Sequence, residues 1–331
     1  MRVTRKRAGS AFALATAATL ILAACGGGDI DDSSASGGTS GEDCGELNMA
    51  VNPWVGYEAS AYVVGQVAEE QLGCTVNYKD LKEEISWQGF STGEVDVVIE
   101  NWGHPDLEKQ YIDEQGVAVD VGSQGNEGVI GWYVPPWLAD EHPEVLDWEN
   151  LNDFASDFAT AETGSQGQLL DGDPSFVTND EALVKNLDLN FKVVYAGSEA
   201  GLIQAFRKAE ENKEFMIGYF YEPQWFLSEV PLVKVNLPPY EEGCDQPASA
   251  VDCDYPPYPL NKVASTEFME SGSPAADLVQ NFKWTNDDQN EVAKMIAEDG
   301  MEPADAADEW ISNNQDMVDT WLSGSGASPS S

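Results

Sequence analysis

Short apolar runs alternate along this chain with segments of helical periodicity, and no other feature constrains the fold as strongly. In the first half, strands are predicted at 46–51 and 74–78, on either side of an amphipathic helix at 57–72. A short helix is predicted at 86–92, and the apolar run VDVVI at 95–99 is typical of a strand buried on both faces. This alternation predicts an α/β fold with sheets rich in parallel strands.

The second half of the chain repeats the pattern. A strand is predicted at 191–195, a helix at 199–212 and a further strand at 215–219. From 273 to 322 the sequence is helical almost throughout, with prolines that mark helix starts. The chain is long enough to bury one large core or two lobes.

The N-terminus has the layout of a secretory signal. Basic residues come first, an apolar run follows at 11–24, and Cys25 stands directly after Leu-Ala-Ala. The run is too short for a stable membrane span, so we expect residues 1–24 to be removed. The motif resembles a bacterial lipobox, in which Cys25 is lipidated; an ordinary cysteine beside a cleavage site is the alternative. Residues 25–43 are then a flexible tether, and 323–331 are a similar disordered tail.

Acidic residues far outnumber basic ones. The 331 residues include 59 Asp and Glu against 16 Lys and Arg, a formal charge of −43. Loss of residues 1–24, with four basic and no acidic residues, would change this to −47 and leave Arg207 as the sole arginine. Nucleic-acid binding needs clustered Lys and Arg, so that class of function is excluded. Ligands dominated by carboxylate or phosphate are disfavoured too, since arginine forks are their usual partners.

Four cysteines remain in the exported chain, and their even number predicts two disulfides. Three pairings are possible, and we favour Cys44–Cys74 with Cys244–Cys253 because each pair would join neighbouring segments. A zinc site is the alternative, but the sequence has no CxxC motif and its two histidines lie far from all four cysteines. We therefore expect neither a metal nor another cofactor.

Residues for catalysis are scarce. The only histidines, His104 and His142, are each followed by proline, and no GxSxG, Walker A or HExxH motif occurs. Paired carboxylates are uninformative in so acidic a chain. The sequence therefore favours a binding protein over an enzyme.

Three aromatic residues lie near the ends of predicted strands. Trp54, Trp102 and Tyr221 each follow such a strand and precede a loop or helix. Ligands of open α/β sheets bind outside the carboxyl ends of strands, where these rings would gather. Packing of each ring against a neighbouring helix is the alternative. An aromatic enclosure in an acidic protein suits a cation without hydrogen-bond donors, such as a quaternary ammonium group.

Several motifs point to one family. They are the lipobox, VNPWVGY at 51–57, GEVD at 93–96 leading into ENW at 100–102, GDPS at 172–175 and YEPQW at 221–225. In order and spacing they resemble the glycine betaine/choline substrate-binding proteins of ABC transporters, over nearly all of residues 45–322.

This resemblance implies a two-lobe periplasmic-binding fold of type II-like α/β architecture, with a hinge between the lobes and a helical C-terminus. Lobe 1 would comprise residues 44–129 plus 234–322, and lobe 2 residues 130–233. The ligand would lie in the cleft between them.

The resemblance also implies an aromatic cage in that cleft. Trp54 and Trp102 would come from lobe 1 and Tyr221 from lobe 2, at a position where relatives usually have Trp. A further aromatic residue of lobe 2 is expected, with Trp132, Tyr133 and Phe176 as candidates.

A betaine would also need donors for its carboxylate. The backbone N–H groups of Gly56, Tyr57 and Glu58, at the start of a helix, offer such an anion site, and Gln224 could add a donor. Asp173 could attract the cation of choline, or cap a helix that begins near Ser175.

The sequence thus predicts a monomeric, lipid-anchored, extracytoplasmic receptor that delivers a quaternary ammonium compound to an ABC permease in the membrane. Glycine betaine is the favoured ligand, with choline or carnitine as alternatives. A secreted lipoprotein enzyme on the same fold and a sensory domain without a transporter are the competing classes.

Overall fold

The computed structural model describes residues 44–176 and 178–323. Its strands are β1 (Glu46–Val51), β2 (Thr75–Asp80), β3 (Val97–Asn101), β4 (Ala118–Val134), β5 (Gly167–Asp171), β6 (Phe191–Tyr195), β7 (Ile217–Glu222), β8 (Val233–Lys234) and β9 (Tyr258–Ser265). Its α-helices are α1 (Val55–Leu72), α2 (Glu83–Thr92), α3 (Pro105–Glu108), α4 (Pro136–Glu141), α5 (Asp180–Asn186), α6 (Glu199–Asn212), α7 (Thr266–Glu270), α8 (Pro274–Asn281), α9 (Asn286–Ala297), α10 (Pro303–Asn313) and α11 (Gln315–Leu322). The predicted signal segment, Cys25, the tether and all of the tail but Ser323 lie outside these residues.

The strands pair in the order β2-β1-β3-β9-β4-β7-β5-β6, with β8 beside β4. β1 is parallel to β2 and β3, and β5 is parallel to β6 and β7. β4 and β9 run antiparallel to their neighbours. Each half of the order thus has a parallel set of three strands, and the predicted α/β class is confirmed.

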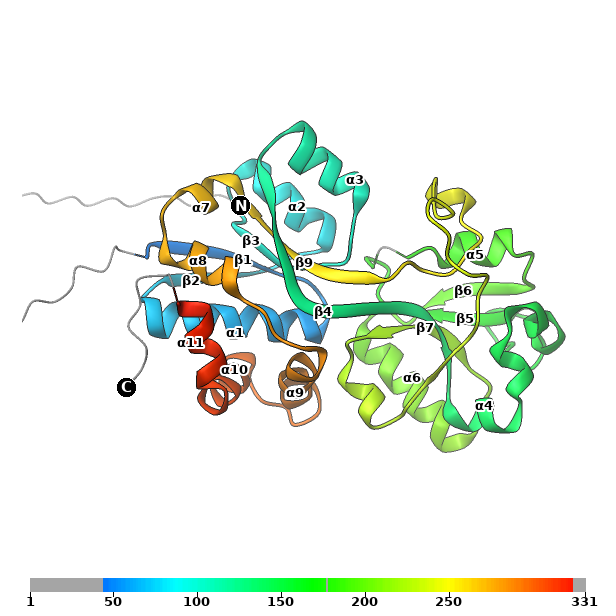
Figure 1. The fold of residues 1–331 in the computed structure, drawn as a ribbon. Coiled ribbons are helices and arrows are strands. Elements are labelled where there is room, and N and C mark those ends of the chain that lie inside the picture. The colour runs from blue at the N-terminus through cyan, green and yellow to red at the C-terminus, as the bar shows by residue number, and fades with distance from the viewer. Residues whose placement is uncertain (1–43, 177, 324–331) are drawn as a thin grey trace, which may run out of the picture. The chain divides into compact units, whose positions relative to one another are not determined.

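β4 runs from one half to the other (Figure 1). Its residues up to Gly128 pair with β9, whereas those from Val129 onward pair with β7 and β8. The first crossing therefore lies between Gly128 and Val129, one residue before the predicted position.

The return crossing lies further along the chain than the sequence suggested. The segment 235–257, assigned by the prediction to lobe 1, bonds instead to lobe 2. Its Tyr255 hydroxyl donates to Asp180 over 2.8 Å, and Asn186 donates to the Val251 carbonyl over 2.8 Å. We therefore propose that lobe 1 comprises residues 44–128 and 258–322, and lobe 2 residues 129–257, and we use the terms in this sense.

Both predicted disulfides are confirmed. Cys44–Cys74 joins the chain just before β1 to the chain just before β2, with a Cα–Cα distance of 4.8 Å. Cys244–Cys253 closes a loop of the return segment, with a Cα–Cα distance of 6.2 Å. The short helix-like turn Ala248–Ala250 in this loop packs against α5, which explains why the loop belongs with lobe 2.

Helix α1 covers the sheet of lobe 1 and begins at the cleft. Val63, Val64 and Val67 are fully buried on it, and the helix packs against α8, α9 and α10. It ends at Gly73, whose φ of 72° only glycine adopts without strain and whose N–H bonds the carbonyl of Ala68. Its first residue lies two positions before the predicted start, directly after Trp54.

Two predicted strands are displaced by about two residues. The strands expected at 95–99 and 215–219 occupy 97–101 and 217–222, because pairing with β9 and β4 sets their ends while the apolar run marks only burial. Tyr221 consequently lies within β7 and not after it. The helical C-terminal region is confirmed as α8 to α11.

None of the described helices has both the length and the apolar character needed to cross a membrane. Within residues 44–176 and 178–323, no group of three or more His, Cys, Asp or Glu side chains is placed to hold a metal ion.

Candidate ligand-binding site

A cavity of about 450 Å³ lies between the lobes, where β1 and β3 end at their carboxyl termini. This volume suits a small ligand, and its position agrees with the usual site in α/β sheets. Its aromatic lining comes from both lobes: Trp54, Trp102, Phe176, Tyr219, Tyr221, Tyr240, Tyr255 and Tyr258. A wider depression of about 1250 Å³ lies at the amino ends of β1 and β3, and Phe90 and Phe268 are its aromatic lining residues. The aromatic cavity between the lobes is therefore the candidate site.

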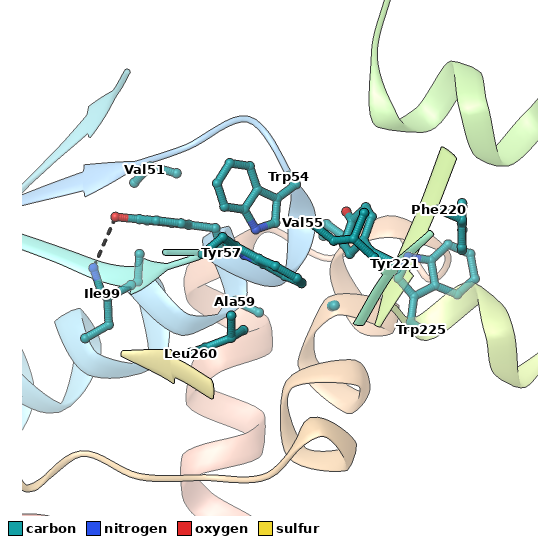
Figure 2. Close-up of a cluster of buried hydrophobic side chains, with 14 of the residues drawn as sticks. Val51, Trp54, Val55, Tyr57, Ala59, Ile99, Phe220, Tyr221, Trp225 and Leu260 are labelled. Atoms are coloured by element: carbon teal, nitrogen blue, oxygen red, sulfur yellow. Dashed lines mark hydrogen bonds between the residues drawn. The ribbon is translucent and has the colours of Figure 1, made fainter. Parts of the chain in front are cut away.

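The predicted cage residues meet across this cavity. Trp102 of lobe 1 lies edge to face with Tyr221 of lobe 2, with ring centroids 5.6 Å apart. Trp54 lies edge to face with Phe176, at 5.8 Å. Figure 2 shows Trp54 on the lobe 1 side and Tyr221 on the lobe 2 side. The structure thus brings together four of the proposed ring positions, with Phe176 as the extra aromatic residue of lobe 2.

Four further rings of the lining were not predicted, namely Tyr219, Tyr240, Tyr255 and Tyr258. Tyr258 begins β9 and lies 5.8 Å from Trp102, and Tyr219 lies 6.2 Å from Phe176. Tyr219 precedes Tyr221 by two positions on β7, so both side chains point to the same face of the sheet. The two tyrosines stand two positions apart in the β7 sequence IGYFYE, and this spacing could have predicted from the sequence that Tyr219 lies beside Tyr221.

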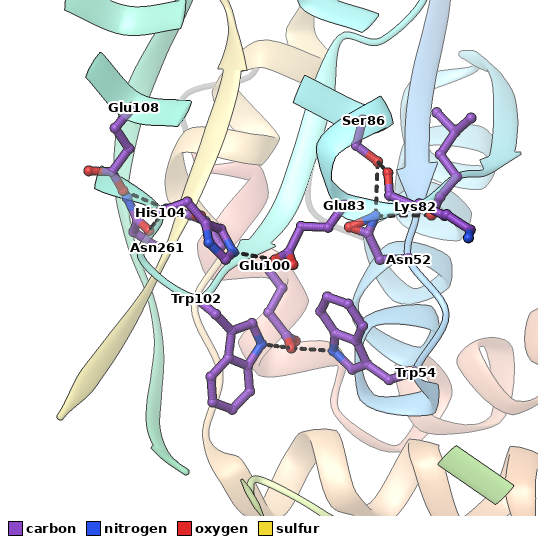
Figure 3. A network of polar contacts seen from close by, with 12 residues as sticks. Asn52, Trp54, Lys82, Glu83, Ser86, Glu100, Trp102, His104, Glu108 and Asn261 are labelled. Carbon is purple, nitrogen blue, oxygen red and sulfur yellow. Dashed lines mark hydrogen bonds and ion pairs between the residues drawn. The ribbon is translucent and has the colours of Figure 1, made fainter. Parts of the chain in front are cut away.

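Glu100 positions both tryptophans of lobe 1. Its Oε1 accepts a hydrogen bond from the indole N–H of Trp54 and another from that of Trp102, each over 2.8 Å (Figure 3). Its Oε2 accepts from Gln289 over 2.9 Å. The glutamate is 1% exposed and lies on β3, between the two indoles. In the sequence, Glu100 could have been recognised as a carboxylate that directly follows the apolar residues of a buried strand.

Burial raises the pKa of Glu100, while the hydrogen bonds from Trp54 and Trp102 act in the opposite direction. These nitrogen partners are donors, so the contacts suit the ionised carboxylate. A carboxylate that accepts from an indole N–H also polarises the ring and makes its face more negative. Glu100 thus both orients the two rings and strengthens their attraction for a cation.

The residues expected to form an anion site at the start of α1, Gly56, Tyr57 and Glu58, are not among the described residues that line the cavity. The Val55 N–H donates to the carboxylate of Glu199, a residue of lobe 2, over 2.9 Å. The Glu58 N–H donates to the Trp54 carbonyl as an ordinary helical bond. A Cβ on Gly56 would lie 2.2 Å from Gln289, so this glycine allows α9 to approach closely. Tyr57 is buried, and its hydroxyl accepts from the Ile99 N–H.

Gln224 also bonds to Glu199 instead of facing the cavity. Its Nε2 donates to Glu199 Oε1 over 2.6 Å, and the Tyr221 hydroxyl donates to the same oxygen. Burial raises the pKa of Glu199, against the lowering effect of these donors. No role for Glu199 was predicted, since it stands 144 positions from Val55 in the chain.

Two other predicted residues are not part of the cavity lining. Trp132 is 1% exposed on β4, and its indole donates to Asp180 over 2.7 Å, so it is a core residue and not a cage residue. Asp173 accepts from the N–H of Ser175 in a local turn and lines a separate groove. Among the described residues, the first helix after Ser175 is α5, which starts at Asp180.

The charged residues of the cavity lining are almost all acidic. Glu84, Asp106 and Asp245 line it, together with Glu83, which is paired with His104 (Figure 3). Coulomb attraction to Glu83 raises the pKa of His104, against the effect of its burial. The described lining contains neither Lys nor Arg. The electrostatics therefore suit a cationic ligand.

Two α/β lobes, a long strand that crosses between them and an aromatic cavity at the crossing define a solute-binding protein of the type that serves ABC importers. The chain belongs to the family described as the substrate binding domain of the ABC-type glycine betaine transport system, which matches residues 45–313. Proteins of this family are extracytoplasmic and work with a permease in the membrane. The family indicated by the sequence motifs is thus confirmed.

Known relatives agree with this assignment. The chain is 25% identical over 127 residues to the glycine betaine/carnitine transport binding protein GbuC of Listeria monocytogenes serotype 1/2a (strain 10403S), a match that spans 38% of each chain. An ABC-transporter choline binding protein in complex with choline has a TM-score of 0.69 at 17% identity, over 86% of this chain and 93% of that one. Lactococcal OpuAC in its closed form with glycine betaine has a TM-score of 0.66 at 19% identity, over 84% and 99%. The two structures establish the shared fold.

Proposed function

We propose that the cavity between the lobes binds a small quaternary ammonium compound, and that Trp54, Trp102, Tyr221 and Phe176 form its cage. The observation that carries this proposal is the pair of indoles that share one oxygen of Glu100. Quaternary ammonium groups have no N–H to donate, so ring faces and nearby carboxylates are what can recognise them. Each good ring contact contributes on the order of 0.5–2 kcal/mol, most in a site without water.

The charge of the ligand is the property to test. Choline and its uncharged carbon analogue, 3,3-dimethylbutan-1-ol, have nearly the same shape, so calorimetric titration of both isolates the cation. We expect choline to bind at least about 100-fold more tightly, since several ring contacts and a buried carboxylate act on its charge. Equal affinity for the two compounds would exclude the cage as a cation site.

The same cavity is proposed to release its ligand unchanged. Mass spectrometry of the ligand recovered after prolonged incubation with the protein tests this, and a chemically altered ligand would indicate an enzyme instead. The predicted monomeric state can be measured by light scattering with and without ligand.

We further propose that Cys25 carries a lipid that holds the protein at the outer face of the membrane, near its permease. The lipobox-like motif is the support for this proposal. Metabolic labelling with a fatty acid should mark the wild-type protein, and Cys25→Ala should abolish the label and release the protein into the medium. Labelling that survives this substitution would place the lipid elsewhere.

A further inference from the structure

We propose that Glu199 determines which quaternary ammonium compounds the site accepts. Its carboxylate lies in the groove next to the cavity and accepts hydrogen bonds from the Val55 N–H and from Gln224, so the site favours a ligand whose remaining part is uncharged, such as choline, over one with a carboxylate, such as glycine betaine. This inference rests on the proposed function of the cavity and reverses the order of ligands that the sequence suggested.

Glu199 is the first residue of α6 in lobe 2, and only 8% of its surface is exposed. Its Oε2 accepts from the N–H of Val55, the first residue of α1 in lobe 1. The start of a helix is where a ligand carboxylate would bind most readily, since unpaired N–H groups and the helix dipole both favour negative charge there. In this protein a side chain of the opposite lobe takes that position.

The second oxygen of Glu199 accepts hydrogen bonds from two side chains of lobe 2. Oε1 accepts from Gln224 Nε2 over 2.6 Å and from the hydroxyl of Tyr221, one of the cage rings. Burial raises the pKa of Tyr221 well above its usual value, so its hydroxyl keeps its proton and stays a donor. Every partner of Glu199 therefore donates to it, which suits its ionised form.

A second anion in this cleft would be poorly accommodated. It would lie near the acidic lining residues Glu83 and Asp245, with Glu199 next to the lining residue Tyr221, and the described cavity lining offers it neither Lys nor Arg. A buried charge without a partner is strongly unfavourable. A hydroxyl group, by contrast, can donate to a carboxylate oxygen, so the alcohol of choline is compatible with the same surroundings.

The contact also links specificity to the approach of the lobes. The Val55–Glu199 bond crosses the cleft, and Glu199 holds the ring of Tyr221 opposite Trp102. A ligand carboxylate that took the Val55 N–H would displace Glu199, and with it a bond between the lobes and a support of the cage. Discrimination by Glu199 therefore works through repulsion and through the loss of a native contact.

Calorimetric titration of the wild-type protein with choline, glycine betaine and tetramethylammonium tests the inference directly. We expect choline to bind at least about tenfold more tightly than glycine betaine, with tetramethylammonium binding detectably because it needs the cage alone. Glycine betaine binding as tightly as choline would overturn the role of Glu199 and leave the proposed function intact. Failure of all three compounds to bind would overturn the proposed function itself.

Substitution of Glu199 provides a second test of the inference. Glu199→Ala frees the Val55 N–H and Gln224 for a ligand, so the ratio of choline to glycine betaine affinity should fall by at least about tenfold. Glu211→Ala, on the exposed face of the same helix, is the matched control and should keep the wild-type ratio. A ratio unchanged in Glu199→Ala would contradict the inference. If that variant does not fold, the wild-type titration decides.

Discussion

Trp102 and Tyr221 meet edge to face across the cleft, with ring centroids 5.6 Å apart and planes at 85°. One ring belongs to lobe 1 and the other to lobe 2, so the approach of the lobes and the completion of the cage are one geometric event. A ligand held by both rings stabilises that arrangement, which is the general logic of closure around a ligand.

Removal of one cage indole should therefore weaken binding strongly. Trp102→Ala is expected to reduce the affinity for choline by at least about 30-fold, since buried aromatic residues at the centre of a site commonly contribute 2 kcal/mol or more. Isothermal titration measures the effect. Trp137→Ala, a buried tryptophan of lobe 2 that packs on Phe215, is the control for lost core packing and should keep the wild-type affinity. Equal losses in both variants would indicate a general effect on folding.

The carboxylate of Glu100 should be as important as the rings that it holds. Glu100→Gln removes the charge and presents an amide to two indole N–H groups, so choline affinity should fall by at least about tenfold. The tryptophan fluorescence of the ligand-free protein should change as well, because two indoles lose their partner. Glu94→Gln, an exposed change before the same strand, should alter neither property. Wild-type affinity in Glu100→Gln would show that the indoles need no carboxylate.

The pH dependence of binding and of stability should run in opposite directions. Burial raises the pKa of Glu100 and of Glu199, so each takes up a proton more readily in the folded protein than in the unfolded chain. Their contribution to the free energy of unfolding is therefore present below the ordinary carboxyl pKa and is lost as the pH rises through the raised value. Cation binding needs the ionised forms, so affinity should fall as the pH drops through the same window.

Tetramethylammonium is the suitable probe of this effect because it does not titrate. Its affinity, measured by calorimetry from mildly alkaline to mildly acidic pH, should decrease, and the decrease should be smaller in Glu100→Gln. An affinity independent of pH in the wild type would mean that neither carboxyl group changes its charge in this range.

A group of charged residues bridges the lobes at the outer edge of the cleft. Arg207 of α6 pairs with Glu298, the residue after α9 in lobe 1, over 3.0 Å and with Glu229 over 3.3 Å. Lys294 of α9 pairs with the same Glu229 over 3.6 Å. Partly exposed pairs of this kind contribute little and are weakened by salt. They can nevertheless favour the closed arrangement.

Arg207→Gln should thus reduce ligand affinity only a few-fold at low salt, by about the amount expected of an exposed pair, and the difference should disappear at high salt. Lys213→Gln breaks an exposed pair with Glu141 inside lobe 2 and should leave the affinity unchanged at any salt concentration. A loss of affinity in Arg207→Gln that persists at high salt would argue against an electrostatic cause.

The two disulfides should differ in their effect on binding. Replacement of Cys244 and Cys253 by serine should lower the free energy of unfolding by about 2–3 kcal/mol in the chain-entropy view and should also weaken binding. The reason is that Asp245 and Gln246 of this loop line the cavity. The same change at Cys44 and Cys74 should reduce stability with no effect on affinity, because that pair lies at the far end of β1. Thermal unfolding and titration of both double variants distinguish the two effects.

Much of the site was accessible from the sequence, for a local reason. Trp54 and Trp102 follow the first and third strands of a parallel set, so their positions are fixed by the strands before them. Cysteine number and spacing were sufficient to predict both disulfides. Tyr221, proposed for the cage from its motif, lines the cavity, although β7 extends past it.

The predictions that differ from the structure concern residues whose places depend on long-range contacts. Trp132 and Tyr133 alternate on β4, and only the pairing of β4 with β7 determines that the indole of Trp132 faces Asp180 in the core. We propose a different lobe for the return segment up to 257 because Asn186 and Tyr255 form bonds between this segment and α5, and such distant partners cannot be paired from the sequence.

The sequence by itself determined the α/β alternation, the disulfide pairs, the family and four of the aromatic residues that line the cavity, since each depends on neighbouring residues or on motif order. Only the tertiary structure decided that Glu100 holds two indoles and that Glu199 accepts a hydrogen bond from the Val55 N–H. Glu199 and Val55 are 144 residues apart, and a hydrogen bond at that separation exists only after both lobes have folded and met. The preference for an uncharged ligand tail is therefore a property of the assembled cleft.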